Sequence, residues 1–242
     1  MSQCRHFQEW KKRAIRARMK KNGFGSMKMT TSTEVYQGQF GEFTITDSDR
    51  TGVIIYRAGL IVAALSFTIG SVLVLWQGAT SVVVQALTPL FAVFSLGLAI
   101  SLVTIHIYLI QLHRLLQLFW LVGTLSAVIV ALTHSEPLAL VIYNRPVTLL
   151  GVGFTFAALT GIFFKEAFCF NRFETKLLTP IIPLLLVGHL VGILPVNVEQ
   201  ILLAIWTILF VVFAVRKAIQ PIPPDIGDKS VFAYLKQQRA KA

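Results

Sequence analysis

The sequence predicts an all-α membrane protein, a bundle of six transmembrane helices with both termini on the cytoplasmic (stromal) side. Its composition, its apolar segments and its charge distribution all point this way. Hydrophobic residues make up 55% of the 242 residues, charged residues make up 14%, and the mean hydropathy is +0.70. Since a soluble domain carries about 25% charged residues, the composition excludes an ordinary soluble enzyme with one core and a solvated surface.

Six apolar segments supply the helices. Each has 18 to 24 residues, close to the ~20 that cross a hydrocarbon core as a helix. Helix is expected because backbone groups in lipid must be satisfied within the segment, and no alternating barrel strands occur. The last segment is the weakest, because polar residues fill its first turn. The predicted spans are Val53–Trp76, Leu90–Ile110, Leu115–Leu132, Val147–Phe164, Leu177–Leu194 and Val196–Val215.

The basic residues determine the predicted orientation. Of 22 lysines and arginines, only Arg145 falls in the loops on one side of this topology, and the other 21 fall on the opposite side or just inside it. Basic residues accumulate on the cytoplasmic side of membrane proteins. Topology therefore accounts for the net charge of +11, and a nucleic-acid partner is excluded.

The chain divides into four predicted parts. Residues 53–215 form the transmembrane domain. Residues 1–29 are a basic arm, either a genuine cytoplasmic segment or an over-extended start, with a transit peptide as a third interpretation. Residues 30–52 are polar, with a weak strand signal at Phe43 and Ile45, and Asp47, Ser48 or Asp49 is expected to cap the first helix. Residues 216–242 are a basic tail with a short amphipathic helix starting at Ser230.

The densest polar feature is the predicted loop 165–176, in which phenylalanines flank charged side chains. Two interpretations stay open. The loop is a docking surface for another protein, since aromatic residues and arginine are enriched at interfaces, or it is an interfacial belt of phenylalanine and snorkelling lysine. The candidate docking residues are Lys165, Glu166, Phe168, Asn171, Arg172, Phe173, Glu174 and Lys176.

Two histidines are candidate ligands. His189 is predicted near the middle of the fifth span, and His106 near the cytoplasmic end of the second. Neutral histidine can bind haem iron or chlorophyll magnesium. The favoured interpretation is a hydrogen bond between helices, because the two histidines differ in depth. We therefore expect no cofactor and no metal, with chlorophyll or haem on His189 as the alternative.

Small residues and one arginine complete the candidate set. Small side chains at four-residue spacing let helices approach closely, and packing within the bundle is the expected role. Arg57, one turn inside the first span, is expected to anchor at the interface, with a lipid phosphate or a partner carboxylate as the alternative. The packing candidates are Gly153, Ala157, Gly161, Gly188 and Gly192, with Gly59 and Ala63 in the first span.

The stretches EAFCFNRFETKLLTPIIPLLLVGHL and GVIIYRAGLIVAAL resemble an integral membrane family of cyanobacteria and plastid-bearing organisms known as a domain of unknown function. The resemblance covers roughly residues 36–218. It implies a photosynthetic cell, the thylakoid or plasma membrane, and a role near photosynthetic complexes, in their assembly.

The leading functional hypothesis is a non-enzymatic membrane protein that contacts the lipid bilayer and other membrane proteins, as a partner or assembly factor of photosystem complexes. Sequence signatures of enzymes such as HExxH, GxSxG and a Walker loop do not occur. The first alternative is a small-solute or lipid carrier, with Pro180 and Pro183 opening a cavity. The second is a pigment or haem protein that uses His189.

Overall fold

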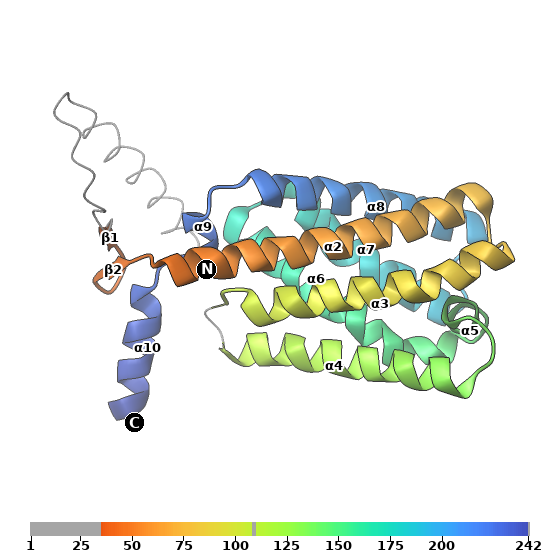
Figure 1. Cartoon of the computed structure of the whole chain (residues 1–242), viewed down its shortest axis with the longest axis horizontal. Helices are drawn as coiled ribbons and strands as arrows, with labels where there is room; N and C mark the ends of the chain where they lie inside the picture. Colours follow the sequence, from red (N-terminus) through yellow and green to blue (C-terminus); the bar gives the residue numbers. More distant parts are fainter. Residues whose placement is uncertain (1–34, 108–109, 242) are drawn as a thin grey trace. The chain divides into compact units, whose positions relative to one another are not determined.

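A computed structural model describes residues 35–107 and 110–241. The prediction for residues 1–29 lies outside them. The described chain is mainly helical, with one two-stranded sheet (Figure 1). Its elements are β1 (Val35–Gln37), β2 (Glu42–Thr44), α2 (Asp47–Gln77), α3 (Ser81–Thr104), α4 (Ile110–Thr133), α5 (Leu138–Asn144), η1 (Pro146–Thr148), α6 (Leu149–Phe170), α7 (Phe173–Leu190), α8 (Val196–Ile219), α9 (Pro223–Ile226) and α10 (Ser230–Lys241).

Six of the described helices are long and apolar enough to cross a membrane, which confirms the predicted class. Their boundaries differ from the predicted spans. Helix α3 begins at Ser81, passes through Pro89 and ends at Thr104, and α7 covers Phe173–Leu190. Helices α2, α6 and α8 continue past their apolar segments into charged sequence. Hydropathy marks where a helix is apolar, whereas the helix itself ends where its backbone hydrogen bonds end.

The chain forms two compact units. The first consists of residues up to Val53 together with the tail from Pro221, and the second of Ile54–Gln220. In the first unit, β1 and β2 pair in antiparallel register, and backbone N–H groups of Gln39 and Phe40 donate to Asp228 and Ser230 of the tail. The tail thus packs with the sequence before the first span, although the sequence analysis treated them as separate segments.

Helix α2 begins with a reciprocal cap. The Thr46 backbone N–H donates to Asp49 Oδ2 at 2.8 Å, and the Asp49 N–H lies 3.3 Å from Thr46 Oγ1. This is the capping-box arrangement, in which two unpaired donors at a helix start are satisfied together. The prediction that Asp47, Ser48 or Asp49 caps the helix is therefore corrected to Thr46, with Asp49 as its partner.

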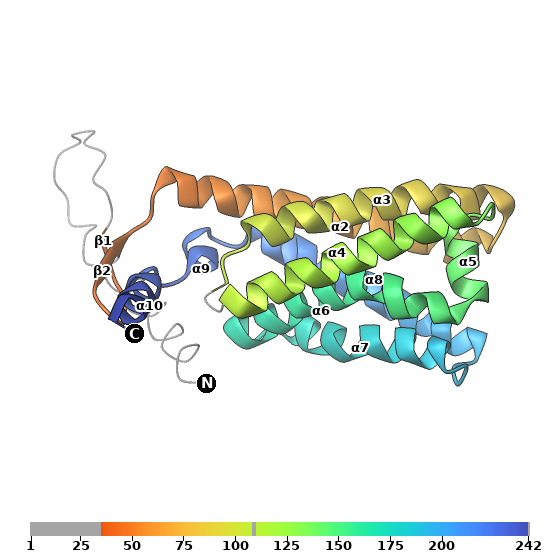
Figure 2. The same cartoon turned by 90° about the horizontal axis from the view of Figure 1, so that it is seen from below.

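The second unit is the helical bundle. Helix α6 contacts α4 and α7, and α8 contacts α7. Figures 1 and 2 show the helices running roughly antiparallel, with α5 at the end that carries the α7–α8 turn. Close approach of α2 and α3 requires small residues, because a Cβ on Gly59 would lie 2.6 Å from the Gly97 carbonyl oxygen. Aromatic rings fill the centre, with Phe67 4.4 Å from Trp206 between ring centroids.

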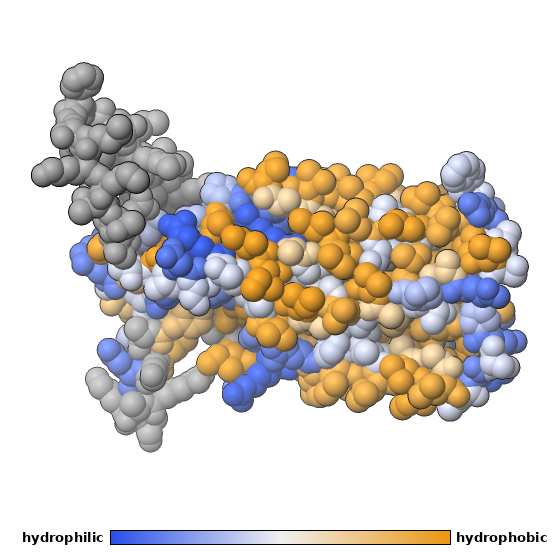
Figure 3. Space-filling view, viewed as in Figure 1, coloured by the Kyte–Doolittle hydropathy of each residue, from blue (hydrophilic) through white to orange (hydrophobic). Residues whose placement is uncertain are grey.

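The outside of the bundle is apolar. In Figure 3 hydrophobic side chains cover the flanks of the long helices, while hydrophilic ones gather towards the helix ends. Large apolar side chains such as Leu96, Ile129 and Ile208 are more than half exposed. A soluble protein rarely exposes so much apolar surface, whereas a lipid-facing surface requires it.

Candidate functional site

The predicted docking loop 165–176 is a tight turn between two helices. Helix α6 continues to Phe170 and α7 starts at Phe173, so only two residues connect them. Asn171 adopts a left-handed conformation with φ 52°, and its N–H donates to the Ala167 carbonyl. Asparagine tolerates this conformation better than most residues. The prediction of a long loop was wrong because four of its charged residues, Lys165, Glu166, Arg172 and Glu174, are paired within the protein, which allows both helices to extend through them.

Glu166 is at the centre of a buried ion cluster. It is fully buried in α6, with Lys217 Nζ 2.8 Å from Oε2 and Lys165 Nζ 2.9 Å from Oε1. Lys217, on α8, is also almost fully buried, and its ammonium lies 4.6 Å from the centroid of the Phe170 ring. Burying a charge is costly unless a partner and hydrogen bonds compensate, and here both carboxylate oxygens have a cationic donor.

A second carboxylate is bound next to the same turn. Glu174 Oε2 lies 2.8 Å from Arg216 Nη1, and Glu174 Oε1 lies 3.9 Å from Arg172 Nη1. Arg172 also donates from Nη2 to the side chain of Gln220, whose backbone carbonyl accepts from Arg57. We call these eight residues the basic-end cluster, which comprises Arg57, Lys165, Glu166, Arg172, Glu174, Arg216, Lys217 and Gln220.

The basic-end cluster corrects the expectation for Arg57. The side chain was expected to snorkel along the lipid surface, but it is only 8% exposed and donates to the end of α8. The cluster therefore connects Arg57, in the first half of α2, with the ends of α6, α7 and α8. Arg216 and Lys217 were not predicted as members. Their position in the last turn of an apolar helix was the available signal, since ionisable groups there need partners.

The candidate docking residues separate into two groups. The first group forms ion pairs within the protein and consists of Lys165, Glu166, Arg172 and Glu174. The others face outward: Phe168 is 52% exposed, Phe173 is 70% exposed, and Asn171 and Lys176 are exposed. We call Phe168, Asn171, Phe173 and Lys176 the turn surface. The buried pairs thus hold a turn whose outer side presents two aromatic rings, an amide and an ammonium.

The two candidate histidines lie at opposite ends of the bundle. His189 is the penultimate residue of α7 and not in the middle of a span, because α7 starts and ends earlier than the predicted segment. Its Nδ1 lies 2.6 Å from Glu199 Oε1 on α8, and its Nε2 lies 3.1 Å from the Tyr143 carbonyl oxygen on α5. His106 follows the end of α3 at Thr104. The hydrogen bond between helices that sequence favoured for His189 is present.

Tyr143 completes the group around His189. Its hydroxyl donates to Glu199 Oε2 at 3.2 Å, and its ring centroid lies 4.7 Å from that of His189. Partial burial and the negative charge of Glu199 raise the pKa of Tyr143, because both disfavour the phenolate. We call His189, Glu199 and Tyr143 the histidine cluster. Tyr143 and Glu199 were not predicted as its members, because residues on three separate helix ends have no common sequence spacing.

The small residues have different roles. A Cβ on Gly161 would overlap the side chain of Leu116 on α4, so this glycine packs helices as expected. Gly153 faces open space, and Ala157 on the same helix is half-buried. Gly188 meets Leu194 of the following turn, and Gly192 lies in that turn with φ +70°. The GxxxG pair at 188 and 192 therefore shapes the end of α7, and does not pack one helix on another.

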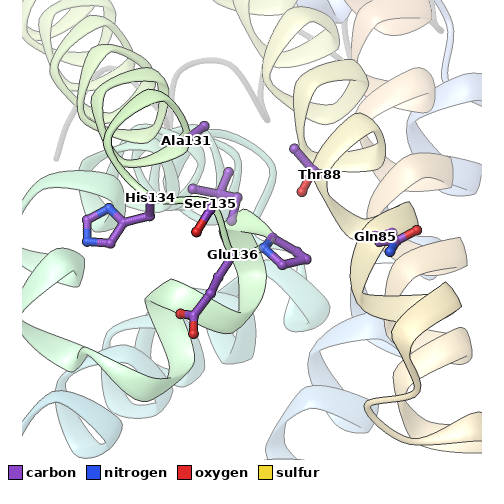
Figure 4. Close-up of a pocket in the computed structure, with 8 residues that line it drawn as sticks. Gln85, Thr88, Ala131, His134, Ser135 and Glu136 are labelled. Atoms are coloured by element: carbon purple, nitrogen blue, oxygen red, sulfur yellow. The ribbon is translucent and has the colours of Figure 1, made fainter.

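A polar pocket lies near the same end as the histidine cluster. Its volume is about 340 Å³, and it is lined by Gln85 and Thr88 of α3 and by His134, Ser135 and Glu136, which follow α4 (Figure 4). The described residues contain no group of three or more His, Cys, Asp or Glu side chains that could hold a metal ion.

Comparison with known protein families identifies the family of the chain. A model of the family described as "Uncharacterized integral membrane protein (DUF2301)" matches residues 100–234. The chain belongs to this family. No curated protein and no solved structure matches the chain.

The match to the DUF2301 family covers most of the site residues. Residues 100–234 contain the histidine cluster and every member of the basic-end cluster except Arg57. The first span, whose sequence was part of the predicted resemblance, lies outside the matched range. The match therefore supports the resemblance from residue 100, near the end of α3, onward, and it identifies an integral membrane protein.

Proposed function

We propose that this DUF2301 protein is a non-enzymatic protein of the photosynthetic (thylakoid) membrane that binds other membrane proteins, as a partner or assembly factor of photosystem complexes. Two arguments support the proposal. The resemblance seen in the sequence implies photosynthetic cells, and the turn surface has the composition of a protein contact. We further propose that both termini lie on the stromal or cytoplasmic side, in line with the distribution of basic residues.

The observation that carries the proposal is the way the basic-end cluster holds the turn surface. Desolvating an ion pair costs several kcal/mol per ion, and a simple connection between two lipid-embedded helices does not need two buried carboxylates. Here Glu166 and Glu174 connect both sides of the turn to α8. These ion pairs hold the backbone of the turn, on which Phe168, Phe173 and Lys176 are exposed. A surface whose backbone is held in place before binding loses less entropy on binding a partner than a mobile one does.

The two alternative functions find less support in the geometry. For a carrier, Pro180 and Pro183 would have to open α7, but the helix is continuous through both. For a pigment protein, His189 would have to offer a ring nitrogen to the metal, but both nitrogens face hydrogen-bond acceptors. Solute flux into proteoliposomes tests the carrier hypothesis, and the absorption spectrum of the pure protein tests the hypothesis of a pigment or haem protein.

The turn surface can be tested by substitution. In tagged protein purified from photosynthetic membranes, we expect Phe173→Ala combined with Lys176→Ala to reduce co-purification of chlorophyll-containing complexes. The matched control combines Trp76→Ala with Leu132→Ala, both 82% exposed and at the other end of the bundle. Arg172 and Glu174 are unsuitable for this test because their loss disturbs the fold. Equal co-purification by the turn variant, the control and the parent would show that this surface does not bind the complexes.

A further inference from the structure

The histidine cluster joins three helix ends through one imidazole ring. His189 is on α7, Glu199 is in the first turn of α8, and Tyr143 is near the end of α5. The side chains of His189 and Glu199 are 18% and 12% exposed, so water reaches them. A carboxylate in the first turn of a helix is also stabilised by the helix dipole. The cluster is therefore partly buried but in contact with solvent at this end of the bundle.

The two hydrogen-bond partners of His189 determine how many of its ring nitrogens must carry a proton. Nδ1 faces a carboxylate oxygen at 2.6 Å and Nε2 faces a backbone carbonyl oxygen at 3.1 Å. Both oxygens accept and neither can donate, unless the carboxyl itself carries a proton. A neutral imidazole has a single N–H. The observed contacts consequently need one proton more than a neutral His189 beside an ionised Glu199 would supply.

No other ionisable side chain of the packed elements faces His189. On α8 the remaining charged residues, Arg216 and Lys217, lie in its last turn. On α6 the titratable residues begin at Lys165, near its far end, and η1 contains none. Arg145, which follows α5, contacts His134 and not His189. The extra proton is thus shared between the imidazole and Glu199, with the Tyr143 hydroxyl donating to the second carboxylate oxygen.

His134, at the same end of the bundle, needs one ring nitrogen without a proton. Arg145 Nη1 lies 2.8 Å from His134 Nε2, and guanidinium can only donate, so this nitrogen must be unprotonated. Nδ1 faces the Val130 carbonyl oxygen at 3.1 Å and the Thr133 hydroxyl at 3.0 Å. Glu136 lines the pocket beside it. Protonating His134 would place an imidazolium against a guanidinium and break the contact.

We propose that His189 and Glu199 form a proton-binding site that controls the attachment of α5. With the proton bound, Tyr143 holds α5 to α7 and α8. Without it, the bond to the Tyr143 carbonyl or to the carboxylate is lost, while the contact of His134 with Arg145 between the ends of α4 and α5 remains. Acid therefore favours one attachment of α5 and disfavours the other. The charge distribution predicts that this end faces away from the stroma or cytoplasm, so the site responds to the opposite compartment.

Histidine-selective ¹⁵N NMR on the full chain in nanodiscs tests the proton count. We expect His189, assigned by its absence in His189→Gln, to show two protonated ring nitrogens at about pH 6. His134 should show one protonated nitrogen, Nδ1, under the same conditions. Ring-nitrogen signals of His189 that do not change between about pH 5 and pH 8 would overturn the proposal, because neither the imidazole nor Glu199 would then gain or lose the shared proton.

Spin-label distances test the movement of α5. Labels at Asn144→Cys on α5 and Val191→Cys after α7, with Cys4 and Cys169 replaced by serine, should give a narrow distance distribution at about pH 5.5 and a longer, broader one at about pH 8. Glu199→Gln should abolish this shift. The control Glu136→Gln removes a carboxylate from the same end and should keep it.

Two results would contradict the proposed control of α5 by the proton. One is a spin-label distance distribution that does not change with pH in the parent protein, and the other is a pH-dependent shift that persists in Glu199→Gln. If Glu199→Gln fails to fold, Tyr143→Phe serves instead. It removes only the hydroxyl bond to Glu199 and should weaken the shift, whereas an unchanged shift would exclude Tyr143 as the link.

Discussion

Lys217 Nζ lies 2.8 Å from Glu166 Oε2, and both side chains are almost completely buried. The two residues belong to α8 and α6, which are 51 residues apart at this contact. Because the protein surrounds this pair, its charges cannot be stabilised by water if one partner is removed. The pair therefore makes the strongest stability prediction of the basic-end cluster.

We expect Lys217→Met to destabilise the protein by about 3–5 kcal/mol, since removing one partner leaves a buried charge incompletely compensated. Lys165 still contacts Glu166 in that variant, which places the expected loss at the lower end of the range. The double change Glu166→Leu with Lys217→Met should recover much of the loss, because no buried charge of the pair remains. Thermal denaturation in detergent measures both variants, and a double variant as unstable as the sum of the single ones would contradict this account.

The contact of α2 with α3 predicts a second effect. Gly59→Ala should destabilise the bundle by about 1–3 kcal/mol, because the new methyl group would lie 2.6 Å from the Gly97 carbonyl oxygen. Gly153→Ala is the matched control, because a Cβ there meets open space. It should be neutral or stabilising by up to about 1 kcal/mol through its higher helix propensity. Equal melting temperatures for the two variants would show that the α2–α3 approach is looser than described.

The cap of α2 predicts a local effect. Thr46→Ala should weaken the start of the helix by about 0.5–2 kcal/mol, because the hydroxyl no longer accepts from the Asp49 N–H. Hydrogen exchange of the Asp49 amide should accelerate, while Ser48→Ala should leave it almost unchanged. An unchanged rate in the threonine variant would mean that Asp49 alone holds the helix start.

Sequence patterns were sufficient for the number and type of the long helices, because hydropathy reflects the lipid environment that surrounds them. They were insufficient for the helix ends. Residues such as Glu166 and Glu174 were placed in a loop, since a charge normally leaves the membrane, but their cations come from distant helices. The partner of a buried charge depends on tertiary contact, which local spacing does not contain.

The same limit applies to the histidine cluster. His189 was recognised as unusual because it is titratable within an apolar segment, and the expected hydrogen bond between helices is present. Its depth was misjudged because α7 starts at Phe173, four residues before the predicted span. Gly192 was assigned to helix packing from its spacing to Gly188, but its positive φ shows that it belongs to a turn.

The predicted orientation is open to a labelling experiment. Single cysteines at Lys176 and Asn144, both exposed and at opposite ends of the bundle, should react with a membrane-impermeant maleimide from opposite sides. The basic end, which includes Lys176, should be protected in intact cells or in vesicles that enclose the cytoplasmic face. Reaction of both positions from the same side would contradict a six-span topology.

The most direct test of the proposed function is a native gel of the tagged, full-length protein extracted from photosynthetic membranes in mild detergent, with an absorption spectrum of each band. The account predicts that the protein migrates with a large chlorophyll-containing complex, and that the Phe173→Ala, Lys176→Ala variant shifts to a small colourless band. A parent protein found only in a small band would contradict it, and pigment in that band would make His189 the first residue to substitute.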